Sequence, residues 1–100
     1  LGSEAAALLE LDFALVPEDF SVADSYLGGG YGVVGELELE AIYTAAHFAG
    51  LLVDPVYTGR ALGGLIDLIR QGTFTARERV LFWHTGGAPA LFAYAEELVL

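Results

Sequence analysis

Apolar residues recur at helical spacing in two stretches of the chain. The first stretch covers residues 36–49 and the second covers residues 59–71. Gly50 and Gly72 follow them, and glycine readily takes the left-handed conformation that ends a helix. The pattern therefore predicts helices over residues 36–49 and 59–71. A weaker repeat predicts a short helix over residues 4–11.

Two short apolar runs, residues 51–53 and 80–83, are strand candidates. The first is expected to be buried on both faces. Pro89 stands where a last helix begins, because the missing N–H of proline has no helical partner in a first turn. The predicted order over residues 36–100 is helix, strand, helix, strand, helix. This order indicates an α/β fold, with a βαβ segment whose strands are parallel and whose crossover is right-handed.

A polar turn follows each predicted strand, and we call residues 54–59 the first elbow and residues 84–89 the second elbow. Ligands of open α/β sheets bind outside the carboxyl ends of the strands, which is where both elbows are expected. Thr58 is the expected cap of the helix after the first elbow, since its hydroxyl can accept from an unpaired amide. Tyr57 is equally a pocket residue or a core aromatic.

The second elbow places His84, Thr85 and the backbone amides around Gly86 beside a predicted helix start. Such a place can hold an anion or the ring of a cofactor. A tight turn with a satisfied histidine is the alternative. Neither His84 nor His47, which lies within a predicted helix and is expected to be structural, belongs to a set of metal ligands, so no metal is expected.

Residues 11–35 show no period and are predicted to form an irregular active-site loop. They include Gly30-Tyr-Gly-Val-Val-Gly35, which matches the G-x-G-x-x-G fingerprint of dinucleotide-binding proteins, with Asp54 about 20 residues further on. That fingerprint requires a strand directly before its first glycine, and residues 20–27 contain polar interruptions. A sharply bending glycine loop is favoured over dinucleotide binding, which is kept as a minor alternative.

Composition limits the possible functions. The 100 residues are 55% apolar with a mean hydropathy of +0.55, so some apolar surface is expected to meet another domain or chain. The formal charge is −10, which argues against nucleic-acid binding. The apolar runs are too short to span a membrane. There is no cysteine and no lysine. The chain starts at Leu1 rather than Met, which fits a fragment.

The glycine loop and both elbows resemble one enzyme family. Tyr31, Asp54-Pro-Val-Tyr57-Thr58-Gly59, Gly64-Leu-Ile-Asp67 and His84-Thr85-Gly86-Gly87-Ala-Pro89 are similar to the D-cysteine desulfhydrase and 1-aminocyclopropane-1-carboxylate deaminase family. The likeness covers about residues 12–98. It implies a pyridoxal 5'-phosphate enzyme with the three-layer (αβα) fold of the tryptophan synthase β subunit (fold type II). Residues 1–100 would be the C-terminal fragment of its large cofactor-binding domain.

The resemblance also implies roles for single residues. Tyr31 and Tyr57 match tyrosines beside the substrate and are the catalytic candidates. Thr85 matches the threonine that meets the pyridine nitrogen, and Gly86 is grouped with it as cofactor-binding. Thr58 stands where deaminases carry a glutamate facing that nitrogen, so it is assigned to the cofactor and favours the desulfhydrase branch. Arg60 replaces a common lysine, which is expected to be a surface change of small consequence.

The expected function is that of a segment of a lyase that converts D-cysteine to pyruvate, ammonia and hydrogen sulfide. Without a lysine to bind the cofactor, the chain alone is expected to be inactive. The implied partners are a small amino-acid substrate, the remainder of the enzyme and a second subunit in a cytoplasmic homodimer. Deamination of a cyclopropane amino acid or another β-elimination remains an alternative. A non-catalytic remnant or interaction module is the alternative from a different class.

Overall fold

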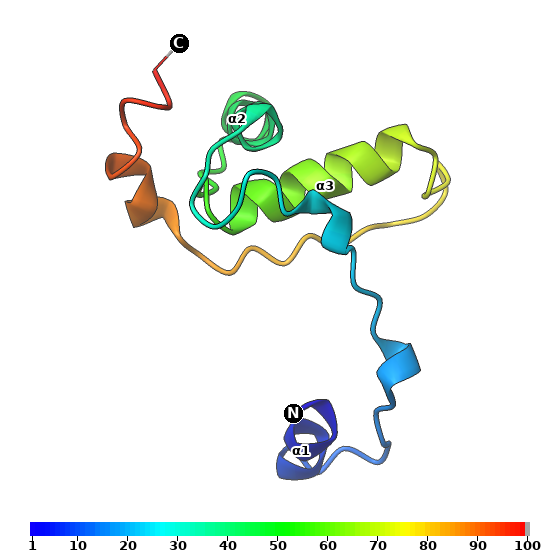
Figure 1. The fold of residues 1–100 in the computed structure, drawn as a ribbon. Helices are drawn as coiled ribbons and strands as arrows, with labels where there is room; N and C mark the ends of the chain where they lie inside the picture. The colour runs from blue at the N-terminus through cyan, green and yellow to red at the C-terminus, as the bar shows by residue number, and fades with distance from the viewer. Residues whose placement is uncertain (100) are drawn as a thin grey trace.

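The computed structural model describes residues 1–99, and its centre is a pair of packed helices, α2 and α3 (Figure 1). In chain order the elements are α1 (Gly2–Leu8), the 3₁₀ turns η1 (Pro17–Asp19) and η2 (Asp24–Tyr26), α2 (Glu36–Thr44), the π-helical turn η3 (Ala45–Ala49), α3 (Thr58–Arg70) and the 3₁₀ turn η4 (Ala88–Phe92). The last residue of the predicted helix–strand–helix–strand–helix region, Leu100, lies outside the described residues.

Helix α2 and turn η3 together confirm the helix predicted over residues 36–49. At the start of the helix, the backbone N–H of Gly35 donates to Oε2 of Glu38 at 2.9 Å. It ends at Gly50, whose φ of +63° is the left-handed conformation that the sequence predicts there. The π turn between these points loosens the helix over its last five residues.

Helix α3 confirms the second predicted helix to within one residue at each end. Gly72 has a φ of +77° and its N–H donates to the carbonyl of Ile69 at 3.0 Å. The next N–H, of Thr73, donates to the carbonyl of Leu68, also at 3.0 Å. These two bonds form a Schellman motif, which satisfies carbonyls that the end of the helix would otherwise leave unpaired.

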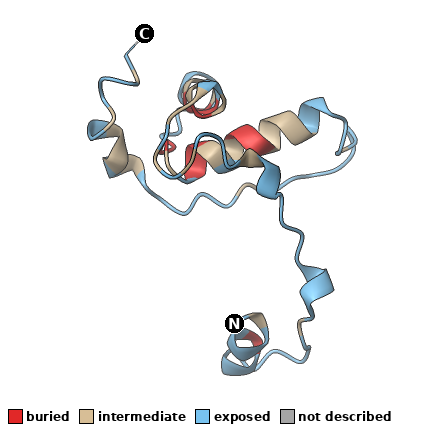
Figure 2. Cartoon of the chain, in the orientation of Figure 1, coloured by how far each residue is buried: buried red, intermediate tan, exposed pale blue. Residues whose placement is uncertain are grey.

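Two glycines let other groups approach α3 closely. A Cβ atom built on Gly63 would stand 2.3 Å from Cδ2 of Leu37 on α2, and one on Gly64 would stand 3.1 Å from the Tyr26 ring on η2. Figure 2 shows the buried residues concentrated on the faces of α2 and α3. The core at this contact contains Ala41, Ile42, Ala45 and Val53, and Leu62, Phe82, Leu91 and Leu98 pack around it.

Neither predicted strand segment lies in a helix or a turn, but no residue in 1–99 is assigned to a strand. Val53 is completely buried, whereas Leu51 and Leu52 are about half exposed, so burial on both faces is not reached within this chain. A strand is defined by hydrogen bonds to a neighbouring strand. Within residues 1–99 neither segment pairs with another strand, and the βαβ topology remains a prediction.

The ends of the chain are only lightly packed. Helix α1 starts two residues earlier and ends three residues earlier than predicted, and it buries only Ala6. Residues 11–35 are irregular, as predicted, apart from η1 and η2. No α-helix begins at Pro89, which is the second residue of the 3₁₀ turn η4, and Phe92 stays exposed, because little apolar surface covers this segment and a helix depends on such packing. Within residues 1–99 no helix has the length and apolar character needed to cross a membrane.

Candidate active site

The carboxylate of Asp54 holds the first elbow together. One oxygen, Oδ2, accepts from the backbone N–H groups of Val56 and Tyr57 at 2.8 Å each, and Oδ1 accepts from that of Thr58 at 2.8 Å. Burial raises the pKa of Asp54, but the hydroxyl of Thr58 and these three amides outweigh burial, so its pKa lies below the usual value. The charged carboxylate thus satisfies the unpaired amides at the start of α3.

The side-chain hydroxyl of Thr58 stabilises this arrangement by binding to Asp54. Thr58 is 3% exposed, and its hydroxyl donates to Oδ1 of Asp54 at 2.6 Å while accepting from the backbone N–H of Asp54 at 2.8 Å. The prediction that Thr58 caps the helix through its own hydroxyl was wrong, because Asp54 takes that role. The Asp54-Pro pair carried the missed signal, since Asp before Pro favours a turn that starts at that residue.

The second elbow lies directly against the first. The hydroxyl of Thr58 is 3.4 Å from the carbonyl oxygen of Gly86. A Cβ atom built on Gly87 would stand 2.4 Å from Oδ1 of Asp54, so only glycine leaves room for this contact. Gly86 and Gly87 have φ values of +107° and +96°, which other residues rarely adopt. The prediction that the two elbows are neighbours is confirmed by these contacts.

His84 links the second elbow to the segment before the first. Its Nδ1 accepts from the backbone N–H of Gly86 at 3.0 Å, and its Nε2 lies 2.9 Å from the carbonyl oxygen of Leu52. Both contacts are satisfied together by the neutral ring with hydrogen on Nε2, because the carbonyl needs a donor and the amide needs an acceptor. His84 therefore joins two backbone segments. This matches the alternative given by the sequence, a tight turn with a satisfied histidine.

The two tyrosines predicted to be catalytic meet at the surface. The hydroxyl groups of Tyr31 and Tyr57 are 2.7 Å apart and share a hydrogen bond, and their rings pack edge to face with centroids 5.8 Å apart. The side chains are 80% and 60% exposed, so they are not core aromatics. The bond to Tyr31 is the main cause that raises the pKa of Tyr57, with burial and the charge of Asp54 adding to it.

Arg60 ties the glycine loop to both helices. From α3 its Nε donates to Oε1 of Glu38 on α2 at 2.6 Å, and its Nη1 and Nη2 donate to the carbonyls of Gly30 at 3.1 Å and Val33 at 2.9 Å. Its side chain is only 15% exposed. The prediction that Arg60 lies at the surface was therefore wrong, and sequence spacing does not reveal such contacts across about 30 residues.

An apolar hollow of about 520 Å³ opens beside the tyrosine pair. Tyr31, Tyr57 and Arg60 supply its polar groups, and its apolar wall includes Leu27, Leu65 and Leu68. A mostly apolar cavity with a few placed polar groups is the usual character of a small-molecule site. The two tyrosines therefore line a space that a ligand of moderate size can enter.

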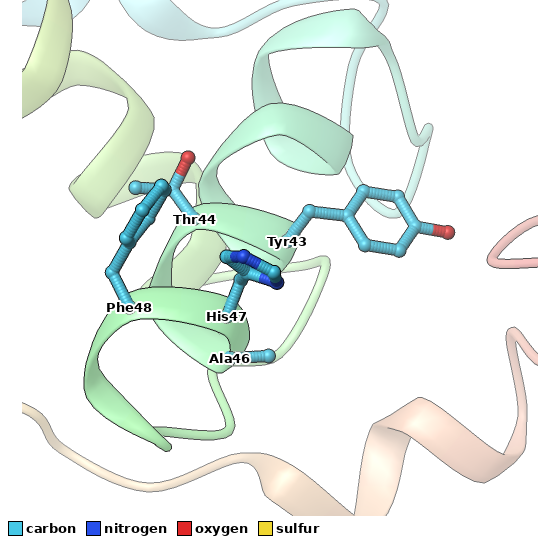
Figure 3. Close-up of a pocket in the computed structure, with 5 residues that line it drawn as sticks. All are labelled: Tyr43, Thr44, Ala46, His47 and Phe48. Atoms are coloured by element: carbon cyan, nitrogen blue, oxygen red, sulfur yellow. The ribbon is translucent and has the colours of Figure 1, made fainter.

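A second hollow, of about 550 Å³, lies on turn η3 (Figure 3). Its lining includes His47 and Phe48, whose rings pack edge to face at 4.9 Å, and both are exposed. Tyr43 also lines this hollow, and its hydroxyl donates to the carbonyl of Leu98. This hollow shares no residue with the tyrosine site.

The second elbow has groups that suit the ring of a cofactor. Thr85 is exposed, so its hydroxyl can reach a heterocyclic nitrogen, and Gly86 beside it presents backbone without a side chain. Thr58 differs, because its hydroxyl is buried and already paired with Asp54. Thr58 thus shapes the elbow, and its direct contact with a cofactor stays a prediction. Within residues 1–99, no hydrogen bond joins the Thr85 side chain to the tyrosine pair.

The dinucleotide alternative does not fit this geometry. Residues 20–27 contain the 3₁₀ turn η2 instead of the strand that the fingerprint requires. The carboxylate of Asp54 is 1% exposed and fully engaged by its own elbow, so it cannot hold a ribose hydroxyl. The glycine loop instead bends around Arg60, which matches the favoured prediction.

The chain is similar in sequence to a group of known enzymes. No protein-family model matches it. It is 51% identical over 76 residues to the D-cysteine desulfhydrases of Salmonella typhi, Salmonella newport and Salmonella heidelberg. The match covers 76% of this chain but only 23% of each relative, so the chain spans less than a quarter of their length. By this identity the chain is similar to a segment of the D-cysteine desulfhydrases.

Proposed function

We propose that this chain is the part of a pyridoxal 5'-phosphate-dependent lyase that lines the substrate side and ring side of the active site. The enzyme would cleave D-cysteine to pyruvate, ammonia and hydrogen sulfide. The observation that carries the proposal is the contact of Tyr31 and Tyr57 beside an apolar hollow. It occurs in a chain that is 51% identical over 76 residues to D-cysteine desulfhydrases.

The chain's own residues have distinct tasks in this proposal. Pyridoxal phosphate, when bound, supplies an electron sink for the carbanion chemistry. The neutral hydroxyl of Thr85 would meet the pyridine nitrogen, and Gly86 would let the ring approach the backbone. The paired hydroxyls of Tyr31 and Tyr57 would hold the substrate or pass a proton at the open end of the hollow. Asp54 and Thr58 would keep the two elbows together.

The remaining parts of the enzyme must come from outside this chain. It has no lysine to bind the cofactor covalently, so that lysine and the loop that grips the phosphate belong to the remainder of the enzyme. We infer that the segments 51–53 and 80–83 become strands of a parallel sheet in the fold of the tryptophan synthase β subunit. A cytoplasmic homodimer is part of the same proposal.

A chimera tests the proposal directly. The matching 76 residues of the Salmonella typhi D-cysteine desulfhydrase are exchanged for those of this chain, and hydrogen sulfide release from D-cysteine is measured. We expect the chimera to bind the cofactor and to release hydrogen sulfide. A folded chimera that binds pyridoxal phosphate but is inactive on D-cysteine, and active on a cyclopropane amino acid, would instead assign the segment to the deaminase branch.

A further inference from the structure

The loop that carries Tyr31 has few contacts of its own. Within the loop, the N–H of Gly30 donates to the carbonyl of Leu27 at 3.2 Å, and the N–H of Val33 donates to that of Gly30 at 3.3 Å. Three of its glycines, 28, 30 and 32, have positive φ values. Glycine loses more conformational freedom on ordering than any other residue, so such a loop needs external anchors to hold one conformation.

The buried ion pair of Arg60 and Glu38 supplies those anchors. Arg60 binds two loop carbonyls, those of Gly30 and Val33, on either side of Tyr31. Glu38 is 2% exposed and uses one oxygen for Arg60 and the other for the N–H of Gly35, at the end of the loop. The loop backbone is thus fixed at three points by one ion pair.

The chemistry of arginine explains why this pair can do so. A guanidinium presents five N–H donors in a rigid planar fork, whereas a lysine ammonium presents its donors from a single atom. Here the fork reaches a carboxylate and two separate carbonyls at once. Hydrogen bonds that involve charged groups are also stronger than neutral ones.

We propose that Arg60, held by Glu38, is a positioning residue that fixes residues 30–33 and thereby sets the Tyr31 hydroxyl against that of Tyr57. This inference rests on the proposed function only in treating the tyrosine pair as part of the substrate site. The positioning itself is a property of the chain alone. It also means that replacing Arg60 by lysine is not a conservative change here.

Hydrogen exchange on the full chain tests the positioning. The variants are Arg60→Met and Arg60→Lys, with Glu38→Gln as a second way to weaken the pair if Arg60→Met fails to fold. Arg70→Met is the matched control, because Arg70 also joins α3 to α2, through Glu40, but at the exposed surface.

We expect Arg60→Met to speed exchange at the amides of Gly30 and Val33 at least about tenfold over the Arg70→Met control. Arg60→Lys should fall between the two. Ring-labelled tyrosine followed by NMR should show the pKa of Tyr57 falling toward its ordinary value as the bond to Tyr31 loosens. Equal loop exchange in the Arg60 and Arg70 variants, with unchanged titration of Tyr57, would overturn the proposal.

The same variants in the chimera separate this inference from the proposed function. Loss of positioning should lower kcat/KM for D-cysteine in Arg60→Met, while Arg70→Met stays at the level of the unmodified chimera. An inactive chimera with Arg60 intact would reject the proposed function. The hydrogen-exchange experiment on the chain alone would then still decide whether Arg60 positions the loop. An active chimera that tolerates Arg60→Met without loss would show that the position of Tyr31 does not matter for turnover, even if loop exchange is faster.

Discussion

Gly87 and Asp54 lie so close that a Cβ atom on the glycine would stand 2.4 Å from the carboxylate oxygen Oδ1. The two residues belong to different elbows, 33 positions apart in the sequence. Their contact places the backbone of the second elbow against the carboxylate of Asp54, which holds the first elbow together. The geometry of the candidate cofactor site therefore depends on the absence of a side chain at residue 87.

Gly87→Ala is expected to destabilise the chain by about 2 kcal/mol or more, because it adds a steric conflict with Asp54 to the cost of a left-handed alanine. Chemical unfolding measures the loss. Gly86→Ala is the matched control, since its φ is also positive but an added Cβ would meet nothing within 4 Å. Equal losses in the two variants would show that the contact with Asp54 is unimportant.

Asp54→Asn is expected to lower the free energy of unfolding by about 2 kcal/mol, because a buried amide cannot accept from all the donors that the carboxylate satisfies. Urea unfolding followed by circular dichroism measures this. The exposed Asp12→Asn serves as the control and should change stability by less than about 0.5 kcal/mol. A variant as stable as the control would contradict the role of Asp54 as an anchor.

Stability should fall on acidification. The pKa values of Asp54 and Glu38 are lowered in the folded chain, burial being outweighed in both by hydrogen bonds from Thr58 and Arg60 and from backbone amides. The unfolded chain then binds protons more readily, so this stability is fully present above the ordinary values of about 4 and is lost as pH falls through the lowered ones. Urea midpoints between pH 7 and 3 test this, and Asp54→Asn should flatten the curve.

In the chimera, Tyr57→Phe and Tyr31→Phe are each expected to lower kcat on D-cysteine by about tenfold or more, because each removes one hydroxyl of the bonded pair. The double variant should lose little more than either single one, since residues that act as a unit are not additive. Tyr43→Phe is the control, because it also loses a hydroxyl bond but lies outside the site. Additive losses would mean that the hydroxyls act independently.

The two threonines of the elbows should separate function from stability. Thr85→Val is expected to reduce turnover of the chimera while changing stability by less than about 0.5 kcal/mol, because Thr85 is exposed. Thr58→Val should cost about 1–3 kcal/mol, since it leaves buried partners of its hydroxyl unpaired. Exposed Thr73→Val is the control for both. Unchanged kinetics in Thr85→Val would remove Thr85 from the cofactor site.

Helices α2 and α3 were predictable because their signals are local. The spacing of apolar residues and the glycines at 50 and 72 determine where α2 and α3 run and end. The strands were not testable in the same way, because an extended segment becomes a strand only beside another one. The chain's apolar runs at 51–53 and 80–83 are therefore consistent with a sheet without forming one here.

The resemblance supplied candidate site residues, but it gave no signal for the residues that hold them in place. Tyr31 and Tyr57 were identified by resemblance, and their contact is found. Asp54, Glu38 and Arg60 were missed as organising residues, because burial and partners distant in sequence decide their roles. A buried charge is costly unless it is paired, so the two nearly fully buried acids, Asp54 and Glu38, mark the places where the chain is held together.

The contacts of Asp54 also have a consequence for how the chain folds. Its carboxylate bonds only to residues two to four positions ahead, so no long loop has to close before these bonds form. Contacts of such short range are made quickly. We therefore infer that the first elbow takes its shape early, and that the second elbow later docks onto a surface that already exists.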